Sequence, residues 1–146
     1  MTTIAWDGKI LAADGQVTRD HSIVMTTTQQ KIFKNVGVFD VLAFCGDWMP
    51  VDDFLDWAEN PEETQPPVGA YTVIFSINGV IHFSSMETPI SECMTLPPGA
   101  VDAWGSGAHL ALGALHSGKT ARQAVNLACK LDVFTGGKVR SVRVVK

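Results

Sequence analysis

The sequence predicts an α+β protein in which helices pack on antiparallel sheets. Two hairpin signals, Asp7-Gly8 and Asn78-Gly79, are each flanked by β-branched and apolar runs. Three other segments combine helix start and stop residues with apolar positions at helical spacing. The predicted order is strands, one helix, strands, two helices and strands. Helices packed on antiparallel sheets would bury the apolar faces of such a chain.

The N-terminal third reads as a series of short strands. Residues 2–6 and 9–14 are strand-like runs joined by Asp7-Gly8. Residues 14–46 continue with β-branched and apolar runs that are interrupted by polar or glycine positions, and residues 35–37 have turn composition. We therefore expect antiparallel hairpins up to residue 46.

The first helix is expected over residues 50–61. Pro50 suits a helix start, and Asp52 and Asp53 complement the helix dipole there. Pro61 ends the segment, and residues 59–69 form a loop. A second hairpin follows over residues 70–85, around Asn78-Gly79.

Two further helices are expected after a short strand and a glycine turn in residues 100–107. The first has an apolar stripe at Ala108, Ala111, Leu112 and Leu115, and Gly118 ends it. The second has a capping-box spacing at Thr120 and Gln123 and runs to Leu131. Residues 132–146 read as a strand, a glycine turn and a last strand.

Length and composition indicate one globular domain over residues 1–146. Hydrophobic residues make up 46% of the chain and charged residues 18%, which excludes a disordered chain. The net charge is −4 and no basic run is present, so we expect no nucleic-acid partner. The apolar runs are too short to cross a bilayer, so we expect no membrane association.

The cysteines and histidines give no sign of a metal site. Cys45, Cys93 and Cys129 have no paired spacing, and the four histidines have no ligand spacing. Unpatterned cysteines without a signal peptide are typical of a reduced, cytoplasmic protein. We predict no metal and no cofactor.

Residues 113–120, GALHSGKT, match the phosphate-loop pattern G-x-x-x-x-G-K-[ST]. That pattern binds phosphate when a strand precedes it and a helix follows, so that backbone amides surround the anion. Here the first glycine lies within a predicted helix. A helix–glycine–helix junction is the favoured interpretation, and a nucleotide site is a distant alternative.

The opening residues MTTIAW place a threonine directly after the initiator methionine. Removal of Met1 would give Thr2 a hydroxyl nucleophile and a free α-amine on the same residue. A small residue such as threonine after methionine normally permits this removal. We therefore expect an exposed Thr2 in the cell.

The chain contains, in this order, the motifs TTIAW, GKILAADGQVT, VMTTTQQKIF, LAFCGD, WGSGAHLALGAL and LDVFTGGKV. Together they resemble the β-subunits of the proteasome and the HslV peptidase. Each piece is common by itself, and their order over nearly the whole chain carries the resemblance. It implies a four-layer αββα sandwich of two antiparallel sheets with helices outside. Between Gly46 and residue 70 the chain has room for about one helix where the family has two, so one helical layer is trimmed.

The resemblance also implies a set of site residues. Thr2 matches the nucleophile, Lys31 the catalytic lysine, and Asp14 the aspartate that orients this lysine. Gly46 matches the residue whose N–H serves the oxyanion hole, and Thr18 a contact to the substrate backbone. The group around the threonine amine matches Ser106, Asp132 and Thr135. Phe44 and Cys45 lie near the strand end expected to line a specificity pocket.

Elementary acid–base chemistry favours the amine of Thr2 as the base. A lysine with an ordinary pKa near 10.4 is neutral in only about 0.04% of molecules at pH 7, whereas an α-amine is neutral in roughly 10–20%. A cationic Lys31 beside the amine would lower the pKa of the amine and favour negative charge on the Thr2 hydroxyl oxygen.

These observations predict a threonine peptidase that cleaves peptide bonds through an acyl-enzyme on Thr2. The implied substrate is a peptide or unfolded protein, and the implied partners are further copies of the chain and an unfoldase ATPase. The trimmed layer would change ring assembly and ATPase docking. The alternative is a non-catalytic structural or assembly protein of the same fold.

Overall fold

The computed structural model describes residues 2–20, 22–61, 64–87 and 93–144. Its contacts divide the chain into two compact units. The first unit contains residues 1–32 and 97–146, and the second contains residues 33–96.

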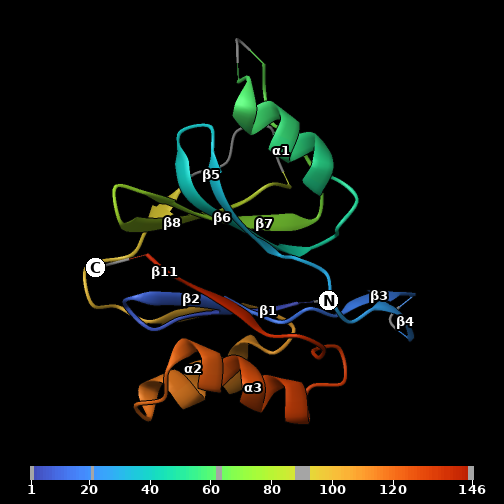
Figure 1. Ribbon diagram of the computed structural model, residues 1–146, viewed down its shortest axis with the longest axis vertical. Coiled ribbons are helices and arrows are strands. Elements are labelled where there is room, and N and C mark those ends of the chain that lie inside the picture. The colour runs from blue at the N-terminus through green and yellow to red at the C-terminus, as the bar shows by residue number, and fades with distance from the viewer. Residues whose placement is uncertain (1, 21, 62–63, 88–92, 145–146) are drawn as a thin grey trace. The chain divides into compact units, whose positions relative to one another are not determined.

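The first unit is built on a four-stranded antiparallel sheet with two helices on one face (Figure 1). The strand order is β10-β1-β2-β11. The strands are β1 (Thr3–Trp6), β2 (Ile10–Ala13), β10 (Asp102–Gly105) and β11 (Arg140–Arg143). The helices are α2 (Ala108–His116) and α3 (Ala121–Leu131).

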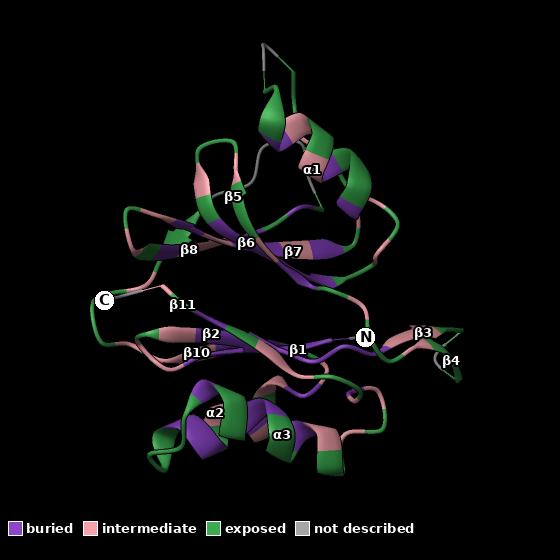
Figure 2. Ribbon diagram, viewed as in Figure 1, coloured by how far each residue is buried: buried purple, intermediate pink, exposed green. Residues whose placement is uncertain are grey.

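Small side chains let these helices lie close to the sheet. The core between them contains Val125, Leu115 and many alanines, among them Ala5 and Ala12 of the sheet and Ala124 of α3. Figure 2 shows the buried residues along the inner sides of α2 and α3. A larger residue here would have to displace a helix, because protein cores are packed without spare volume.

A separate two-stranded sheet belongs to the first unit. It pairs β3 (Val17–Arg19) with β4 (Ile23–Thr26), and its register shifts between Val17 and Thr18. In the sequence, this two-stranded sheet follows Asp14, the residue after β2, and precedes Lys31.

The second unit contains a five-stranded sheet in the order β5-β6-β7-β8-β9 and one helix. Aromatic residues fill the space between α1 and the sheet, with Phe54 of the helix packed against Phe44 and Tyr71. The elements are β5 (Ile32–Val36), β6 (Phe39–Gly46), α1 (Val51–Glu59), β7 (Tyr71–Ile77), β8 (Val80–Ser85) and β9 (Met94–Thr95).

The predicted α+β class is confirmed, as are its main local signals. Asn78 and Gly79 both have positive φ in the turn between β7 and β8. Thr120 and Gln123 form both hydrogen bonds of the capping box at the start of α3. The helix α1 ends at Glu59, just before Asn60 and Pro61.

The strand predicted at the start of residues 132–146 is wrong. Residues 132–135 form a turn instead, and Val133 is 81% exposed. The cause is Asp132, whose side chain accepts hydrogen bonds from the Phe134 N–H and the Thr135 hydroxyl. An aspartate that bonds the chain just after it favours a turn over an extended strand.

Among the described residues, no helix is both long enough and apolar enough to cross a membrane.

Candidate active site

Thr2 lies directly before β1 and is buried, with 2% of its surface exposed. Its carbonyl oxygen accepts a hydrogen bond from the Ser106 N–H at 2.9 Å. Gly105 allows this approach: it has a φ of +99°, and a Cβ atom at this position would lie 1.7 Å from the Thr2 carbonyl oxygen. The turn after β10 thus holds the backbone of Thr2.

Lys31 brings its ammonium group to the Thr2 hydroxyl. Its Nζ donates hydrogen bonds to Thr2 Oγ1 and Asp14 Oδ1, both at 2.9 Å, and to the Gln16 carbonyl at 2.6 Å. An ammonium has three N–H donors, so these three acceptors define its orientation. Lys31 is the largest side chain that is fully buried among the described residues.

Asp14 follows β2 and joins the lysine to the backbone around it. Its Oδ1 also accepts the Thr3 N–H at 3.1 Å, and its Oδ2 accepts the Gly136 N–H at 3.1 Å. The side chains of Asp14 and Lys31 form an ion pair with no solvent exposure. Removal of either partner would leave a buried charge without its counter-charge, which is strongly destabilising.

A second polar group surrounds Asp132, at the C-terminus of α3. Its Oδ2 accepts the Ser106 hydroxyl at 2.7 Å and the Thr135 hydroxyl at 2.6 Å, and its Oδ1 accepts the Phe134 N–H at 3.2 Å. Burial raises the pKa of the Asp132 carboxyl, but these hydrogen bonds outweigh burial and lower the pKa below its ordinary value of 3.8. Asp132 is therefore an ionised hydrogen-bond acceptor at neutral pH.

The structure brings six of the residues identified from the sequence into the first unit around two carboxylates. Thr2, Lys31 and Asp14 share direct hydrogen bonds, and so do Ser106, Asp132 and Thr135. The Thr2 carbonyl and the Ser106 N–H connect the two groups.

The other residues lie elsewhere in the chain. Thr18 is in the two-stranded sheet of β3 and β4. Gly46 ends β6 in the second unit, and a Cβ atom there would meet the Ala70 carbonyl oxygen at 2.6 Å. Cys45 is buried on the same strand. Phe44 is completely buried, with its ring against Phe33, Trp48 and Phe54, so it packs the core of the second unit rather than lining a pocket.

Sequence reasoning missed Thr3 and Gln16. The Thr3 hydroxyl lies 2.7 Å from Thr135 Oγ1 and accepts the Gly107 N–H at 3.0 Å. The repeated threonine at the start of the chain was the available signal for it. Gln16 accepts a hydrogen bond from Lys31 through its main-chain carbonyl, and a main-chain contact leaves no trace in the residue type.

The phosphate-loop pattern of residues 113–120 forms the predicted helix–glycine–helix junction between α2 and α3. Its amides are already bonded: Gly118 donates to Leu115, Lys119 donates to Ala114, and Thr120 donates to the Gln123 side chain. The Thr120 hydroxyl caps α3. A phosphate would have to displace these internal bonds, so the geometry opposes a nucleotide site.

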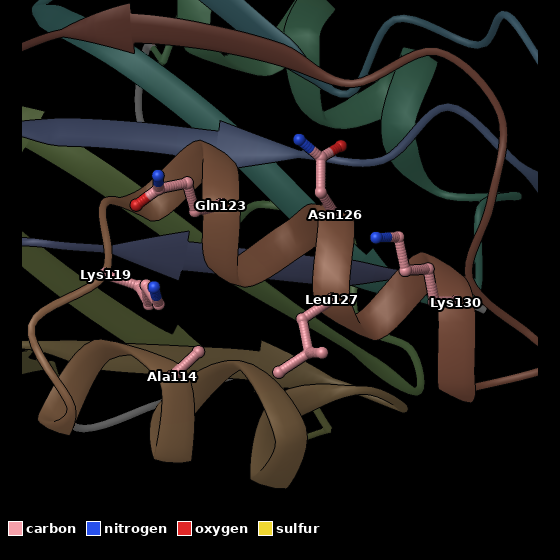
Figure 3. A pocket seen from close by; sticks show the side chains of 6 residues that line it. All are labelled: Ala114, Lys119, Gln123, Asn126, Leu127 and Lys130. Carbon is pink, nitrogen blue, oxygen red and sulfur yellow. The ribbon is translucent and has the colours of Figure 1, made fainter.

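A hollow of about 330 Å³ lies between α2 and α3 beside this junction (Figure 3). Lys119 and Lys130 lie toward its two ends, with Leu127 between them. No group of three or more histidine, cysteine, aspartate or glutamate residues suited to a metal occurs within the described part of the chain.

Comparison with known proteins shows the fold. No protein-family model matches the chain, and no curated protein sequence matches it. Among solved structures, HslV from Trypanosoma brucei matches with a TM-score of 0.71 and 18% sequence identity, over 98% of both chains. Two structures of BPH from Thiobacillus denitrificans, one of them in complex with epoxomicin, match with a TM-score of 0.67 and 18% identity, over 97% of this chain and 96% of that one. The chain therefore has the proteasome/HslV-family fold.

Proposed function

We propose that this protein is an N-terminal threonine peptidase that cleaves peptide bonds through an acyl-enzyme on Thr2. The observation that carries the proposal is the contact of Lys31 Nζ with Thr2 Oγ1 at 2.9 Å, beside the buried carboxylate of Asp14. A threonine hydroxyl in an ordinary core has no need of a buried cation, whose desolvation is costly.

The proposed reaction begins after removal of Met1, which lies outside the described residues. The free Thr2 amine takes the proton from Thr2 Oγ1, and Oγ1 attacks the carbonyl carbon of the scissile peptide bond. The tetrahedral intermediate collapses, the amine returns the proton to the leaving nitrogen, and an ester to Oγ1 remains. Water, deprotonated by the same amine, then hydrolyses this ester and restores Thr2.

Each charged group has a distinct part in this proposal. Lys31, as an ammonium, stabilises negative charge on Oγ1, and Asp14 holds Lys31 in place. Asp132, with Ser106 and Thr135, orients the Thr2 amine. Thr18, in the first unit with Thr2, contacts the substrate backbone.

The wider biology of the proposal rests on the shared fold. We propose a peptide or unfolded protein as substrate, a cytoplasmic location, assembly with further copies of the chain, and delivery of substrate by an unfoldase ATPase. BPH was solved with epoxomicin, so epoxomicin is the first ligand to test on this chain.

The test begins with the intact mass of protein expressed without an N-terminal tag. We expect a mass that lacks methionine and turnover of a fluorogenic peptide. Thr2→Ala and Lys31→Ala should each lower kcat/KM by about 1,000-fold or more, because residues that act as one catalytic unit fail together. Loss of Lys31 also leaves the buried Asp14 carboxylate unpaired, so Lys31→Ala tests catalysis only in protein that circular dichroism shows to be folded. Lys119→Ala removes an exposed lysine outside the site and is the matched control; it should retain activity.

Two outcomes would contradict the mechanism. Full activity in Thr2→Ala, with correct folding shown by circular dichroism, would exclude Thr2 as the nucleophile. A protein that has lost methionine yet neither cleaves peptides nor is stabilised by epoxomicin would be a non-catalytic protein of this fold.

A further inference from the structure

The side chain of Thr3 lies where the two polar groups of the candidate site meet. It is fully buried. The backbone N–H of Thr3 donates to Asp14, and its carbonyl accepts the Asp14 N–H at 3.2 Å. Its hydroxyl contacts Thr135, which in turn contacts Asp132. Thr3, which follows the proposed nucleophile in the chain, thus forms hydrogen bonds with both polar groups, that of Asp14 and that of Asp132.

The direction of the hydrogen bonds follows from counting protons. A threonine hydroxyl has one proton to donate, and an ionised carboxylate has none. Thr135 donates its proton to Asp132 Oδ2 at 2.6 Å. The proton in the 2.7 Å contact between Thr3 and Thr135 must therefore come from Thr3. Thr3 Oγ1 in turn accepts the Gly107 N–H at 3.0 Å.

The result is a one-way chain from the start of α2 to the end of α3. It runs from the Gly107 N–H to Thr3, from Thr3 to Thr135 and from Thr135 to Asp132. Gly107 precedes α2 and allows the approach, because a Cβ atom there would lie 2.3 Å from Thr3 Oγ1. Hydrogen bonds arranged in series polarise one another, so each donor strengthens the next.

We propose that Thr3 is a positioning residue of the candidate site, whose hydroxyl fixes the orientation of Thr135 and Asp132 next to Thr2. The expected effect of Thr3 on catalysis rests on the proposed peptidase function. The hydrogen-bond chain does not depend on that function. Without the Thr3 hydroxyl, Thr135 could rotate away from Asp132, and the group that orients the Thr2 amine would lose its defined geometry.

Two substitutions separate the hydroxyl of Thr3 from its shape. Thr3→Val keeps the branched shape and removes the donor, whereas Thr3→Ser keeps the donor and removes the methyl group. Thr28→Val, on an exposed threonine, is the matched control for the same chemical change. All proteins are first checked for loss of methionine and for folding by circular dichroism.

The kinetic expectation is a loss in kcat that the hydroxyl restores. Thr3→Val should lower kcat by about 10- to 100-fold with little change in KM, because a misplaced reacting group slows chemistry without weakening binding. Thr3→Ser should stay within about threefold of the unchanged protein, as should Thr28→Val. Equal kcat in Thr3→Val and the unchanged protein would overturn the proposal.

A second measurement does not depend on peptidase activity. The titration of the Asp132 carboxyl carbon, followed by NMR, should move to higher pH in Thr3→Val and remain in place in Thr3→Ser. A protein without peptidase activity that shows this shift would reject the proposed function and retain the hydrogen-bond chain. No shift in a folded Thr3→Val would overturn the chain.

If Thr3→Val does not fold, the unchanged protein provides the test. The Thr3 hydroxyl proton should be visible by NMR, protected from rapid exchange with water and close to the Thr135 hydroxyl. A Thr3 hydroxyl proton that exchanges as fast as that of the exposed Thr28 would overturn the proposal.

Discussion

Asp132 illustrates how a single residue controls both local structure and charge. Its carboxylate stabilises a turn after α3, where the sequence predicted a strand. One carboxylate oxygen accepts hydrogen bonds from two hydroxyl groups. The contact with Ser106 joins residues 26 positions apart, so it requires the folded chain. It therefore makes the ionised form of Asp132 part of the stability of the protein.

This contribution has a defined pH dependence. The pKa of Asp132 is lower in the folded protein than the ordinary 3.8, so the folded state binds this proton less readily than the unfolded state. The stabilisation is complete above the ordinary pKa and is lost as the pH falls through the folded pKa. Urea unfolding of the wild type and Asp132→Asn should show a stability difference at pH 6 that shrinks toward pH 3. A difference that grows at low pH would contradict this assignment.

Cys129 provides a second prediction at the residue scale. Burial, together with the negative charge of Asp14, raises the pKa of its thiol from 9.0 to about 11. At pH 8 its reactive thiolate should be about 100-fold rarer than in an ordinary thiol. Iodoacetamide labelling with peptide mapping should therefore modify the exposed Cys93 at least about tenfold faster than Cys129.

The control for this labelling is Cys93→Ser, in which the fast phase should disappear. Since the folded pKa of Cys129 is the higher one, stability linked to this thiol is present below pH 9 and lost as the pH rises toward 11. Labelling of Cys129 as fast as Cys93 at pH 8 would contradict the raised pKa.

The sequence indicates the charged members of the site better than the main-chain members. Lys31 and Asp14 stand out because they lie in the motifs that carry the sequence resemblance, and the structure places them 2.9 Å apart. The contribution of Gln16 is a carbonyl that every residue type has. The role of Thr3 depends on a contact with Thr135, 132 positions away, which local patterns do not reveal.

At the scale of elements, the turn between β10 and α2 approaches the backbone of Thr2 closely. Gly105→Ala would place a methyl group against the Thr2 carbonyl oxygen, at a backbone angle that side chains rarely adopt. We expect it to lower the free energy of unfolding by at least about 2 kcal/mol, because overlap adds to backbone strain. The proposed peptidase activity should fall with it.

Gly99→Ala is the matched control for this substitution. Gly99 has a φ of +80°, and no atom lies within 4 Å of a Cβ built on it. It should cost only the backbone strain, about 1–2 kcal/mol. Urea denaturation compares the two variants, and equal losses would show that the contact with Thr2 is unimportant.

Elements with strong local signals could be predicted, and those decided by side-chain contacts could not. The capping box of α3 and the Asn78-Gly79 turn act within a few residues, so their patterns suffice. The segment 132–135 has the β-branched and aromatic residues typical of a strand, and the Asp132 carboxylate overrides them. Propensity is a weak guide where one side chain bonds the backbone beside it.

At the scale of the whole molecule, the order of the elements predicted the fold class. Antiparallel hairpins and three helices are compatible with few arrangements, and 18% identity to HslV over 98% of both chains shows that the fold persists with little sequence in common. The core positions need only small or aromatic residues of suitable volume. Such tolerance allows two chains to share a fold at 18% identity.

The expectation of a single domain over residues 1–146 leads to a prediction about unfolding. Trp6 and Trp104 lie in the first unit, and Trp48 and Trp57 in the second. The double variants Trp48→Phe/Trp57→Phe and Trp6→Phe/Trp104→Phe each report on one unit by fluorescence. Circular dichroism gives the overall urea transition of each variant. We expect the fluorescence transition of the same variant to coincide with it, because chains of this size usually unfold in one step. Two separate midpoints would mean two domains.

The carbonyl of Gln16, 2.6 Å from Lys31, has a consequence for genetics. No codon change removes a main-chain oxygen. A random mutagenesis screen for lost function can therefore find substitutions at Asp14 and Lys31, but it cannot test the Gln16 carbonyl. Chemical synthesis could reach it: an ester in place of the peptide bond after Gln16 would weaken the oxygen while every side chain stays unchanged. Mutations can therefore change only some of the groups that bind the Lys31 ammonium.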